Sequence, residues 1–245
     1  MDICDPLKDI IKHTHGLGFI DMLKLIGTDT DAKIEAMDVD KSVIMYGTMY
    51  QPITGLNSTV GLSQLGVLRG FLDYSKSYDK STVSVISQAR SGVDTLTGIE
   101  FNANGNKSTY RFMAENVVNE QIKVPPFKGA VWHAVVKPTK PALSDLVFFA
   151  NTLGSFESTF VVSTENGCLM FNIGTGATNR TTLKFADNVQ HVLKQWAYPL
   201  SQVLSILKLN QTSDCTMSFS DMGALKIDID SGMGLYSYIL PARQQ

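Results

Sequence analysis

The chain has 245 residues and a formal net charge of −2, with 44% hydrophobic and 18% charged residues. This length fits one large domain or two domains of about 100–150 residues each, and the hydrophobic content supports packed cores. The small negative charge excludes a chain that is basic throughout, as a general wrapper of nucleic acid would be. The sequence has no apolar run near the roughly 20 residues that a membrane-spanning helix needs, and residues 1–5 do not resemble a signal peptide.

Three cysteines, Cys4, Cys168 and Cys215, lie far apart in the sequence. An odd and widely spaced set indicates reduced thiols, because a disulfide framework needs pairs. The sequence therefore predicts a cytoplasmic protein.

The first half of the chain predicts two helices and two groups of strands. The first helix runs from Asp5 to His15, with Asp5 as its cap and Pro6 in its first turn. Short alternating runs between residues 19 and 52 predict strands. The second helix is expected over Gly61–Leu72, where leucines recur at helical spacing, and further strands extend to about residue 114.

Residues 115–136 are expected to link the two halves as an extended segment. The adjacent Pro125 and Pro126 disfavour a helix and cannot donate hydrogen bonds within a sheet. We therefore predict a first domain at residues 1–118, a connecting strap at 119–130 and a second domain at 131–245.

The second half contains the same two kinds of element. The turn Glu165-Asn166-Gly167 between two apolar runs is typical of a β-hairpin. In chain order we expect a strand at Trp132–Val136, a helix at Ala142–Leu153, strands at Thr159–Thr164, Cys168–Ile173 and Thr181–Ala186, a helix at Pro199–Leu207, and strands at Cys215–Phe219, Ala224–Ile229 and Leu235–Leu240.

The order of these elements indicates an internal duplication. Residues 199–240 read as a helix, a strand and a hairpin, and residues 62–112 offer the same order. The earlier hairpin is expected across Asn104-Gly105-Asn106. Each half then consists of a helix, about three strands, a second helix and three or four strands. The period is much longer than that of a solenoid repeat, so we predict an α+β fold with two similar domains.

The usual motifs of enzymes and metal sites are absent from the sequence. Gly174-Thr175-Gly176 lacks the third glycine of a dinucleotide fingerprint and the Lys-Ser/Thr of a phosphate loop. His13 and His15 diverge by about 200° on a helix and cannot chelate one metal. His133 and His191 are isolated in the sequence. We therefore predict no catalytic residue, no metal and no cofactor. An enzyme with a dispersed site, such as an esterase that uses a serine and His133, is the alternative among catalytic proteins.

This architecture resembles the DNA polymerase sliding clamps, and most closely the three-subunit clamps of large tailed bacteriophages. The resemblance extends from Asp5 to Ala242. It depends on the opening helix, the strap at Ile122–Phe127, the hairpin around residues 165–172 and the terminal hairpin at 224–240. It implies a DNA clamp fold in which each domain packs two lumen-side helices on antiparallel sheets. A homotrimeric ring in the cytoplasm, or in the host cytoplasm if the protein is viral, is then expected.

In such a ring the helices line a hole that holds duplex DNA. The resemblance implies that cations on or beside the four helices meet phosphates without sequence specificity. These cations are Lys8, Lys12, Arg69, Lys76, Lys80, Lys137, Lys140 and Lys208. The helix at 142–153 departs from the family pattern, since it carries Asp145 and no Lys or Arg.

The resemblance also implies a DNA polymerase and an ATP-driven clamp loader as partners. Clamps bind the short peptide tails of such partners in an apolar groove. The candidate groove residues are Val124, Pro125, Phe127, Ile239, Leu240 and Pro241. Ring closure pairs sheet edges of neighbouring subunits, and the candidate edges are Thr109–Ala114 and Thr181–Ala186.

The main hypothesis is thus a non-enzymatic ring that tethers the replicative polymerase to DNA. The alternative is a β-rich structural virion protein, a tail or capsid component, in which the duplication builds a pseudo-symmetric unit. That alternative predicts large assemblies and no clustering of cations on helices.

Overall fold

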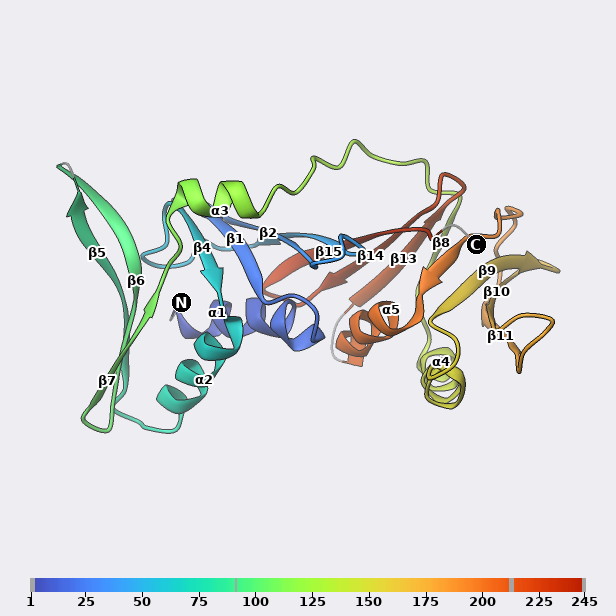
Figure 1. Ribbon diagram of the computed structural model, residues 1–245, viewed down its shortest axis with the longest axis horizontal. Coiled ribbons are helices and arrows are strands. Elements are labelled where there is room, and N and C mark those ends of the chain that lie inside the picture. Colours follow the sequence, from blue (N-terminus) through green and yellow to red (C-terminus); the bar gives the residue numbers. More distant parts are fainter. Residues whose placement is uncertain (1–2, 91, 212–213, 244–245) are drawn as a thin grey trace. The chain divides into compact units, whose positions relative to one another are not determined.

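The computed structural model describes residues 3–90, 92–211 and 214–243 (Figure 1). The chain forms two compact units, one of Met1–Pro125 with Ser231–Tyr236 and one of Pro126–Asp230 with Ser237–Gln245. The domain bounds predicted from the sequence, 1–118 and 131–245 with a strap at 119–130, remain a prediction. No described helix is long and apolar enough to cross a membrane.

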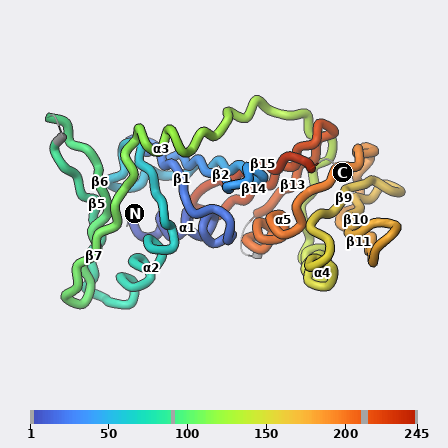
Figure 2. Tube along the Cα trace, in the orientation of Figure 1, coloured from blue at the N-terminus to red at the C-terminus, as the bar shows by residue number. Residues whose placement is uncertain are grey.

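The first unit combines two antiparallel sheets with helices. Its elements are α1 (Cys4–Lys12), a 3₁₀ turn (His15–Leu17), β1 (Met22–Gly27), β2 (Ala32–Met37), β3 (Ile44–Met49), β4 (Thr59–Ser63), α2 (Leu65–Lys76), β5 (Thr82–Arg90), β6 (Val93–Ala103), β7 (Asn106–Arg111) and α3 (Glu115–Gln121). One sheet has the order β4-β1-β2-β3, and β5-β6-β7 form the other. Figure 2 shows β5, β6 and β7 as one long twisted ribbon beside α2.

The core of the first unit follows from alternation in the strands and helical spacing in the helices. Leu23 and Leu25 of β1 are buried opposite Ala36 and Ile34 of β2. The helices add buried apolar faces: Leu7, Ile10 and Ile11 from α1, and Leu65, Leu68 and Leu72 from α2. Each such side chain contributes about 1.5–3 kcal/mol on burial, so packing outweighs the cost of Gly66 and Gly70 inside α2.

The second unit repeats this plan. Its elements are β8 (Ala134–Val136), α4 (Lys140–Leu153), β9 (Thr159–Glu165), β10 (Cys168–Ile173), β11 (Thr181–Ala186), β12 (Ala197–Pro199), α5 (Leu200–Leu207), a 3₁₀ turn (Lys208–Gln211), β13 (Asp214–Ser220), β14 (Ala224–Asp230) and β15 (Gly234–Pro241), of which the first three residues belong to the first unit. One sheet has the order β12-β9-β10-β11, and β13 pairs with both β14 and β8. Buried aromatic rings of Phe160, Phe171, Tyr198 and Phe219 fill the core.

The internal duplication and the α+β fold are confirmed. Each half runs through a helix, four strands, a second helix and three strands, and the four strands take equivalent places in both sheets. Strand β4 therefore corresponds to β12, and β3 corresponds to β11. The hairpins at Asn104-Gly105 and Asn166-Gly167 form as predicted, with positive φ at all four residues.

The prediction of a helix over Gly61–Leu72 is wrong at its start. Gly61 lies in β4, where its backbone exchanges two hydrogen bonds with Met113, and a Cβ at this position would lie 2.8 Å from Val118. The helix begins at Leu65, directly after Gln64 with its left-handed φ of 54°. Leu62 and Leu65 fit both a strand followed by a helix and one longer helix, so their spacing misled the prediction.

The linker is also less extended than predicted. Glu115–Gln121 forms α3, which packs Val118 against β4. Within the predicted linker, residues 115–136, only residues 122–133 lack regular structure, and they include both prolines. At the other end of the unit, α1 begins at Cys4, so Asp5 lies in the first turn and not at the cap.

Candidate nucleic-acid interface

A groove of about 370 Å³ lies between α1 and α2 in the first unit. Figure 1 shows both helices below the strands β4, β1 and β2 of this unit. The groove is lined by Lys8, Ile11, Lys12, Gly16, Arg69, Leu72 and Asp73. Three of the eight predicted DNA-facing cations therefore come together in one depression.

The charges of this groove come from residues one helical turn apart. Lys8 and Lys12 are four residues apart on α1, on the side away from its buried face. Arg69 places Nε 3.6 Å from Oδ2 of Asp73, one turn further along α2. Because both partners are more than half exposed, this ion pair contributes little stability, but it offsets part of the positive charge. Lys8 and Lys12 take part in no ion pair with the described residues.

The second unit has an equivalent groove of about 560 Å³ between α4 and α5. Its lining is Lys140, Leu143, Ser144, Val147, Leu204, Leu207 and Lys208. Lys140 is the first residue of α4, and the Thr139 hydroxyl caps that helix by accepting the amide of Ala142. The predicted helix began at Ala142 and left this lysine outside. The groove thus carries two cations beside apolar walls.

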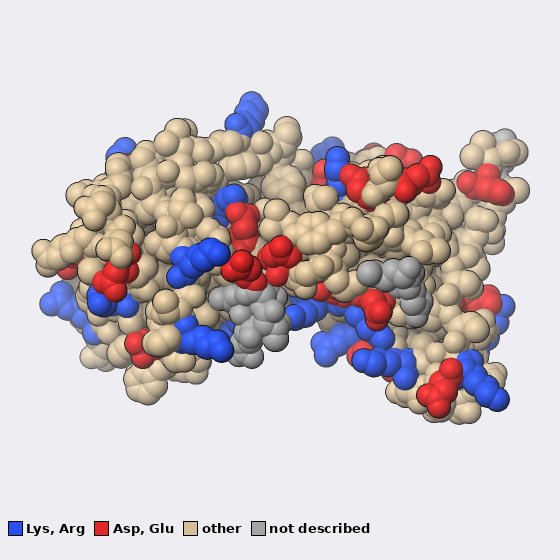
Figure 3. Space-filling model, turned by 180° about the vertical axis from the view of Figure 1, so that it is seen from behind, with Lys and Arg blue, Asp and Glu red and all other residues tan. Residues whose placement is uncertain are grey.

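The other three predicted cations lie outside the two grooves. Lys76 is in the last turn of α2 and Lys80 is in the loop that follows, and both are exposed. Lys137 places Nζ 3.2 Å from Oδ1 of Asp214, in an exposed ion pair. On the face of the molecule in Figure 3, Lys and Arg side chains lie in small groups, with acidic side chains and wide uncharged areas between them.

The predicted partner-peptide residues differ in their exposure. In the first unit Val124 is half-buried, and the carbonyl of Pro125 accepts a hydrogen bond from the Tyr46 hydroxyl. In the second unit Pro241 is exposed, and Phe127 is 41% exposed and stacks on Trp132 at 6.0 Å. Ile239 and Leu240 are 8% and 0% exposed. These two neighbours point to opposite faces of β15, and both faces are covered at this end of the strand, so neither side chain offers surface to a peptide.

The predicted edge Thr181–Ala186 coincides with β11, whereas Thr109–Ala114 only overlaps the end of β7, and its Met113 is already paired with Gly61 of β4. Strand β7 ends the sheet β5-β6-β7, and β11 ends the sheet of the second unit. Strand β3, the counterpart of β11, is continued on its outer side, where the amide of Tyr50 donates to the carbonyl of Met233 at 2.9 Å. The outer edge of β3 is therefore hydrogen-bonded to a further segment, whereas the equivalent edge of β11 is the end of its sheet.

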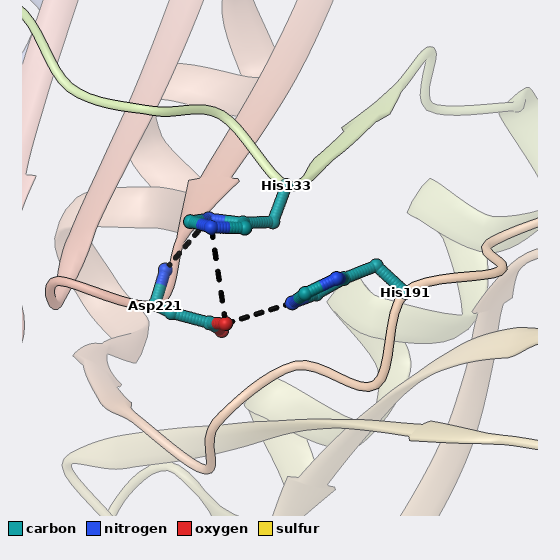
Figure 4. Close-up of side chains that lie close together, drawn as sticks. All are labelled: His133, His191 and Asp221. Carbon is teal, nitrogen blue, oxygen red and sulfur yellow. Dashed lines mark hydrogen bonds and ion pairs between the residues drawn. The ribbon is translucent and has the colours of Figure 1, made fainter.

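One cluster was missed by sequence reasoning (Figure 4). His133 and His191 are isolated in the sequence, yet their ring centroids are 4.6 Å apart and both approach Asp221. The Nε2 atoms of His191 and His133 lie 2.7 Å and 4.0 Å from Oδ2 of Asp221. His133 precedes β8, His191 lies in the loop before β12, and Asp221 lies in the turn after β13. Pairing of β8 with β13 brings two of these segments together, and no local pattern signals it.

Backbone groups hold this cluster in place. The amide of Lys194 donates to Oδ1 of Asp221 at 2.9 Å, and the amide of Asp221 donates to Nδ1 of His133 at 3.2 Å. The Trp196 indole donates to the carbonyl of Asp221 at 3.0 Å. Burial opposes ionisation of Asp221, but the Lys194 amide and His191 outweigh it and hold the pKa of this carboxyl below its usual value.

Solved structures of PCNA share this architecture over the whole chain. The protein is similar to the Proliferating Cellular Nuclear Antigen of Entamoeba histolytica, with a TM-score of 0.66 and 12% identity over 99% of this chain and 96% of that one. The chain has the sliding-clamp fold. It also matches A. fulgidus PCNA bound to the C-terminal region of FEN-1, with a TM-score of 0.70 and 10% identity over 99% and 96% of the two chains.

A third similar structure with the clamp fold is the PCNA2–PCNA3 complex of Sulfolobus tokodaii. Its TM-score is 0.61, with 16% identity over 99% of this chain and 97% of that one. No protein-family model and no curated protein sequence matches the chain. The resemblance to sliding clamps is thus confirmed in the fold, while the particular likeness to bacteriophage clamps remains a prediction.

Proposed function

We propose that the protein is a ring-shaped sliding clamp that encircles duplex DNA and tethers the replicative DNA polymerase for processive synthesis. The observation that carries this proposal is the clamp fold over 99% of the chain, with 96–97% of each similar structure covered. The work of such a protein is mechanical, because a closed ring stays on DNA by topology. It needs no catalytic group and no cofactor.

Five cations in the helix grooves are the proposed principal contacts to DNA: Lys8, Lys12, Arg69, Lys140 and Lys208. Lys76, Lys80 and Lys137 are proposed as additional contacts at or near helix ends. Lysine and arginine bind phosphates without reading sequence, and such contacts weaken as salt rises. Weak, exchangeable contacts suit a ring that must slide. A net charge of −2 for each chain keeps DNA from binding all over the surface.

We propose a homotrimer closed by the edges of β7 and β11. Terminal strands carry unpaired backbone groups that pair readily with another chain. The corresponding edge of β3 is already paired within the chain, which supports a partner strand for the equivalent edge of β11. The Sulfolobus tokodaii structure is itself a complex of two PCNA chains. In the proposed ring, residues 1–118 and 131–245 are the two clamp domains and 119–130 the strap.

Short peptides of the polymerase and of an ATP-driven clamp loader are the proposed partners. The A. fulgidus PCNA structure contains the C-terminal region of FEN-1, which supports peptide binding by this fold. Apolar residues at the surface are the proposed contacts, with the half-buried Val124 and the exposed Pro125 in the first unit and the exposed Phe127 and Pro241 in the second.

Primer extension with the cognate polymerase and loader tests this function. We expect longer products per binding event when the protein is loaded on primed circular DNA. Light scattering separates the clamp from the virion alternative. Three copies of the 26.8 kDa chain give a particle of about 80.4 kDa. Large open assemblies without polymerase stimulation would support a tail or capsid component instead.

A further inference from the structure

The second unit contains a cluster of two imidazoles and one carboxylate that the clamp function does not use. One ligand atom from each of His133, His191 and Asp221 lies within 4.8 Å of the others. The three residues come from three separate segments of the chain, before β8, before β12 and after β13. Figure 4 shows the His191 ring pointing at the carboxylate of Asp221, with the His133 ring, seen nearly edge-on, next to the same carboxylate. From this geometry we propose a binding site for a divalent transition-metal ion, with Zn²⁺ as the expected occupant.

The donor set selects the class of ion. Two imidazole nitrogens with one carboxylate oxygen suit Zn²⁺, Co²⁺ or Ni²⁺, whereas Mg²⁺ and Ca²⁺ prefer oxygen ligands alone. Zinc sites with three protein ligands complete their coordination with water. His191 is exposed and gives an ion access from solvent, while His133 and Asp221 are half-buried and fix the inner side of the site.

The distances require only small movements. Zinc–ligand bonds of 2.0–2.2 Å in a tetrahedron separate neighbouring ligand atoms by about 3.3 Å. The pair His191 Nε2 and Asp221 Oδ2 is now at 2.7 Å, and the pair His133 Nε2 and Asp221 Oδ2 is at 4.0 Å. The first pair must open by about 0.6 Å, which the exposed His191 allows, and the second must close by about 0.7 Å through a shift of the half-buried His133 or Asp221.

The surrounding hydrogen bonds orient the carboxylate for this role. The Lys194 amide occupies Oδ1 of Asp221 and leaves Oδ2 facing the two rings. Such support of a ligand by a neighbouring group is a regular part of metal sites. The amide of Asp221 donates to Nδ1 of His133, so the neutral ring carries its proton on Nε2. Metal binding at Nε2 requires this proton to move to Nδ1, which breaks the 3.2 Å hydrogen bond from the Asp221 amide, and the new metal–nitrogen bond has to outweigh that loss.

The test is calorimetric titration of untagged, chelator-treated full-length protein with ZnCl₂. We expect one Zn²⁺ per chain with a Kd below about 100 µM. Co²⁺ in place of Zn²⁺ is expected to give a visible absorption spectrum without thiolate charge transfer, which excludes the cysteines as ligands. Excess Mg²⁺ is expected not to compete.

Variants locate the site. His191→Ala is expected to weaken Zn²⁺ binding at least about tenfold, and Asp221→Asn to do the same with the carbonyl oxygen still able to accept the Lys194 amide. The matched control is His15→Ala, because His15 also pairs with a carboxylate, at 3.1 Å from Asp21, but has no second imidazole there. Unchanged melting of His191→Ala without metal shows that the fold is intact. Absence of saturable Zn²⁺ binding, or equal affinity in His191→Ala and the parent, overturns the proposal. Neither outcome bears on the clamp function, since the site does not depend on it.

Discussion

The imidazole of His13 lies flat against the phenol ring of Tyr236, with ring centroids 4.0 Å apart and planes 5° apart. The contact joins the end of α1 to the start of β15 within the first unit. The hydroxyls of Tyr236 and Ser231 both donate to Oδ2 of Asp9 at 2.8 Å. A polar cluster therefore ties the first helix to a segment more than 200 residues later in the sequence, and it is sensitive to pH.

Stability is expected to fall as pH is lowered from 7.5 to 5. Burial disfavours the charged form of His13 because it removes the imidazolium from water, and repulsion by the charge of Lys12 disfavours it further. Together they lower the pKa of His13 from 6.5 to about 3. Between these values the unfolded chain binds a proton that the native chain does not. The free energy of unfolding therefore drops, by about 2 kcal/mol at pH 5. Chemical denaturation at several pH values measures it.

Asp9 acts in the opposite direction at the acid end. Burial raises the pKa of its carboxyl, although Ser231, Tyr236 and Lys12 work against this shift, so the native chain takes up this proton before the unfolded chain does.

The matched control for the His13 prediction is His13→Phe, which keeps an aromatic ring against Tyr236 and removes the titration. A slope between pH 6.5 and 5 that is equal in this variant and the parent would show that His13 is not the cause.

Phe171→Ala is expected to destabilise the second unit by about 3–5 kcal/mol, because the lost ring leaves a cavity in a packed core. Phe171 is fully buried and lies 4.1 Å from Phe185 and 4.5 Å from Phe160, measured between ring centroids. Phe156→Ala is the control, since Phe156 is 85% exposed and its loss should change stability by less than about 0.5 kcal/mol. Similar denaturation midpoints for the two variants would argue against this core.

Two glycines are expected to respond to alanine with opposite signs. Gly167 has φ +74° in the β9–β10 turn, and no atom lies near enough to obstruct a Cβ, so Gly167→Ala should cost about 1 kcal/mol through backbone strain alone. Gly70 lies on the exposed side of α2 with the same open space, and Gly70→Ala should stabilise by up to about 1 kcal/mol. Thermal melting of both variants measures the difference, and equal signs would contradict the turn geometry.

Reversal of charge in the first groove is expected to impair the clamp without breaking the ring. Lys8→Glu with Lys12→Glu places two anions where phosphates are proposed to pass, so retention on DNA should fall and the fall should deepen at low salt. The mass of the oligomer should stay the same. Lys33→Glu with Lys41→Glu is the control, because it makes the same change of charge at exposed positions away from the helices. Equal losses in both double variants would remove the groove from the DNA-binding surface.

Local chemistry allowed much of the fold to be predicted. Asn-Gly pairs that favour positive φ located two hairpins, and β11 lies where the alternation of Thr181–Ala186 placed it. The order of elements then predicted the duplication and the clamp fold. The helix α3 was missed because Val118 gains its burial from contact with β4, which no local pattern shows.

The site was less accessible to prediction for the same reason. Helical spacing placed Lys8 and Lys12 together, but only the packing of α4 against α5 brings Lys140 and Lys208 to one groove. The burial of both Ile239 and Leu240 depends on tertiary packing that covers both faces of β15 at this end. The approach of His133 to His191 depends on the pairing of β8 with β13, which joins distant parts of the sequence.

Retention on DNA of different topology tests the encircling ring most directly. The protein is loaded on nicked circular DNA, separated from free protein, and measured on the DNA before and after a single cut makes the circle linear. Encircling predicts stable retention on the circle at salt that abolishes simple ionic binding, and rapid loss after the cut. Equal retention on circular and linear DNA, or loss from both at that salt, would contradict it.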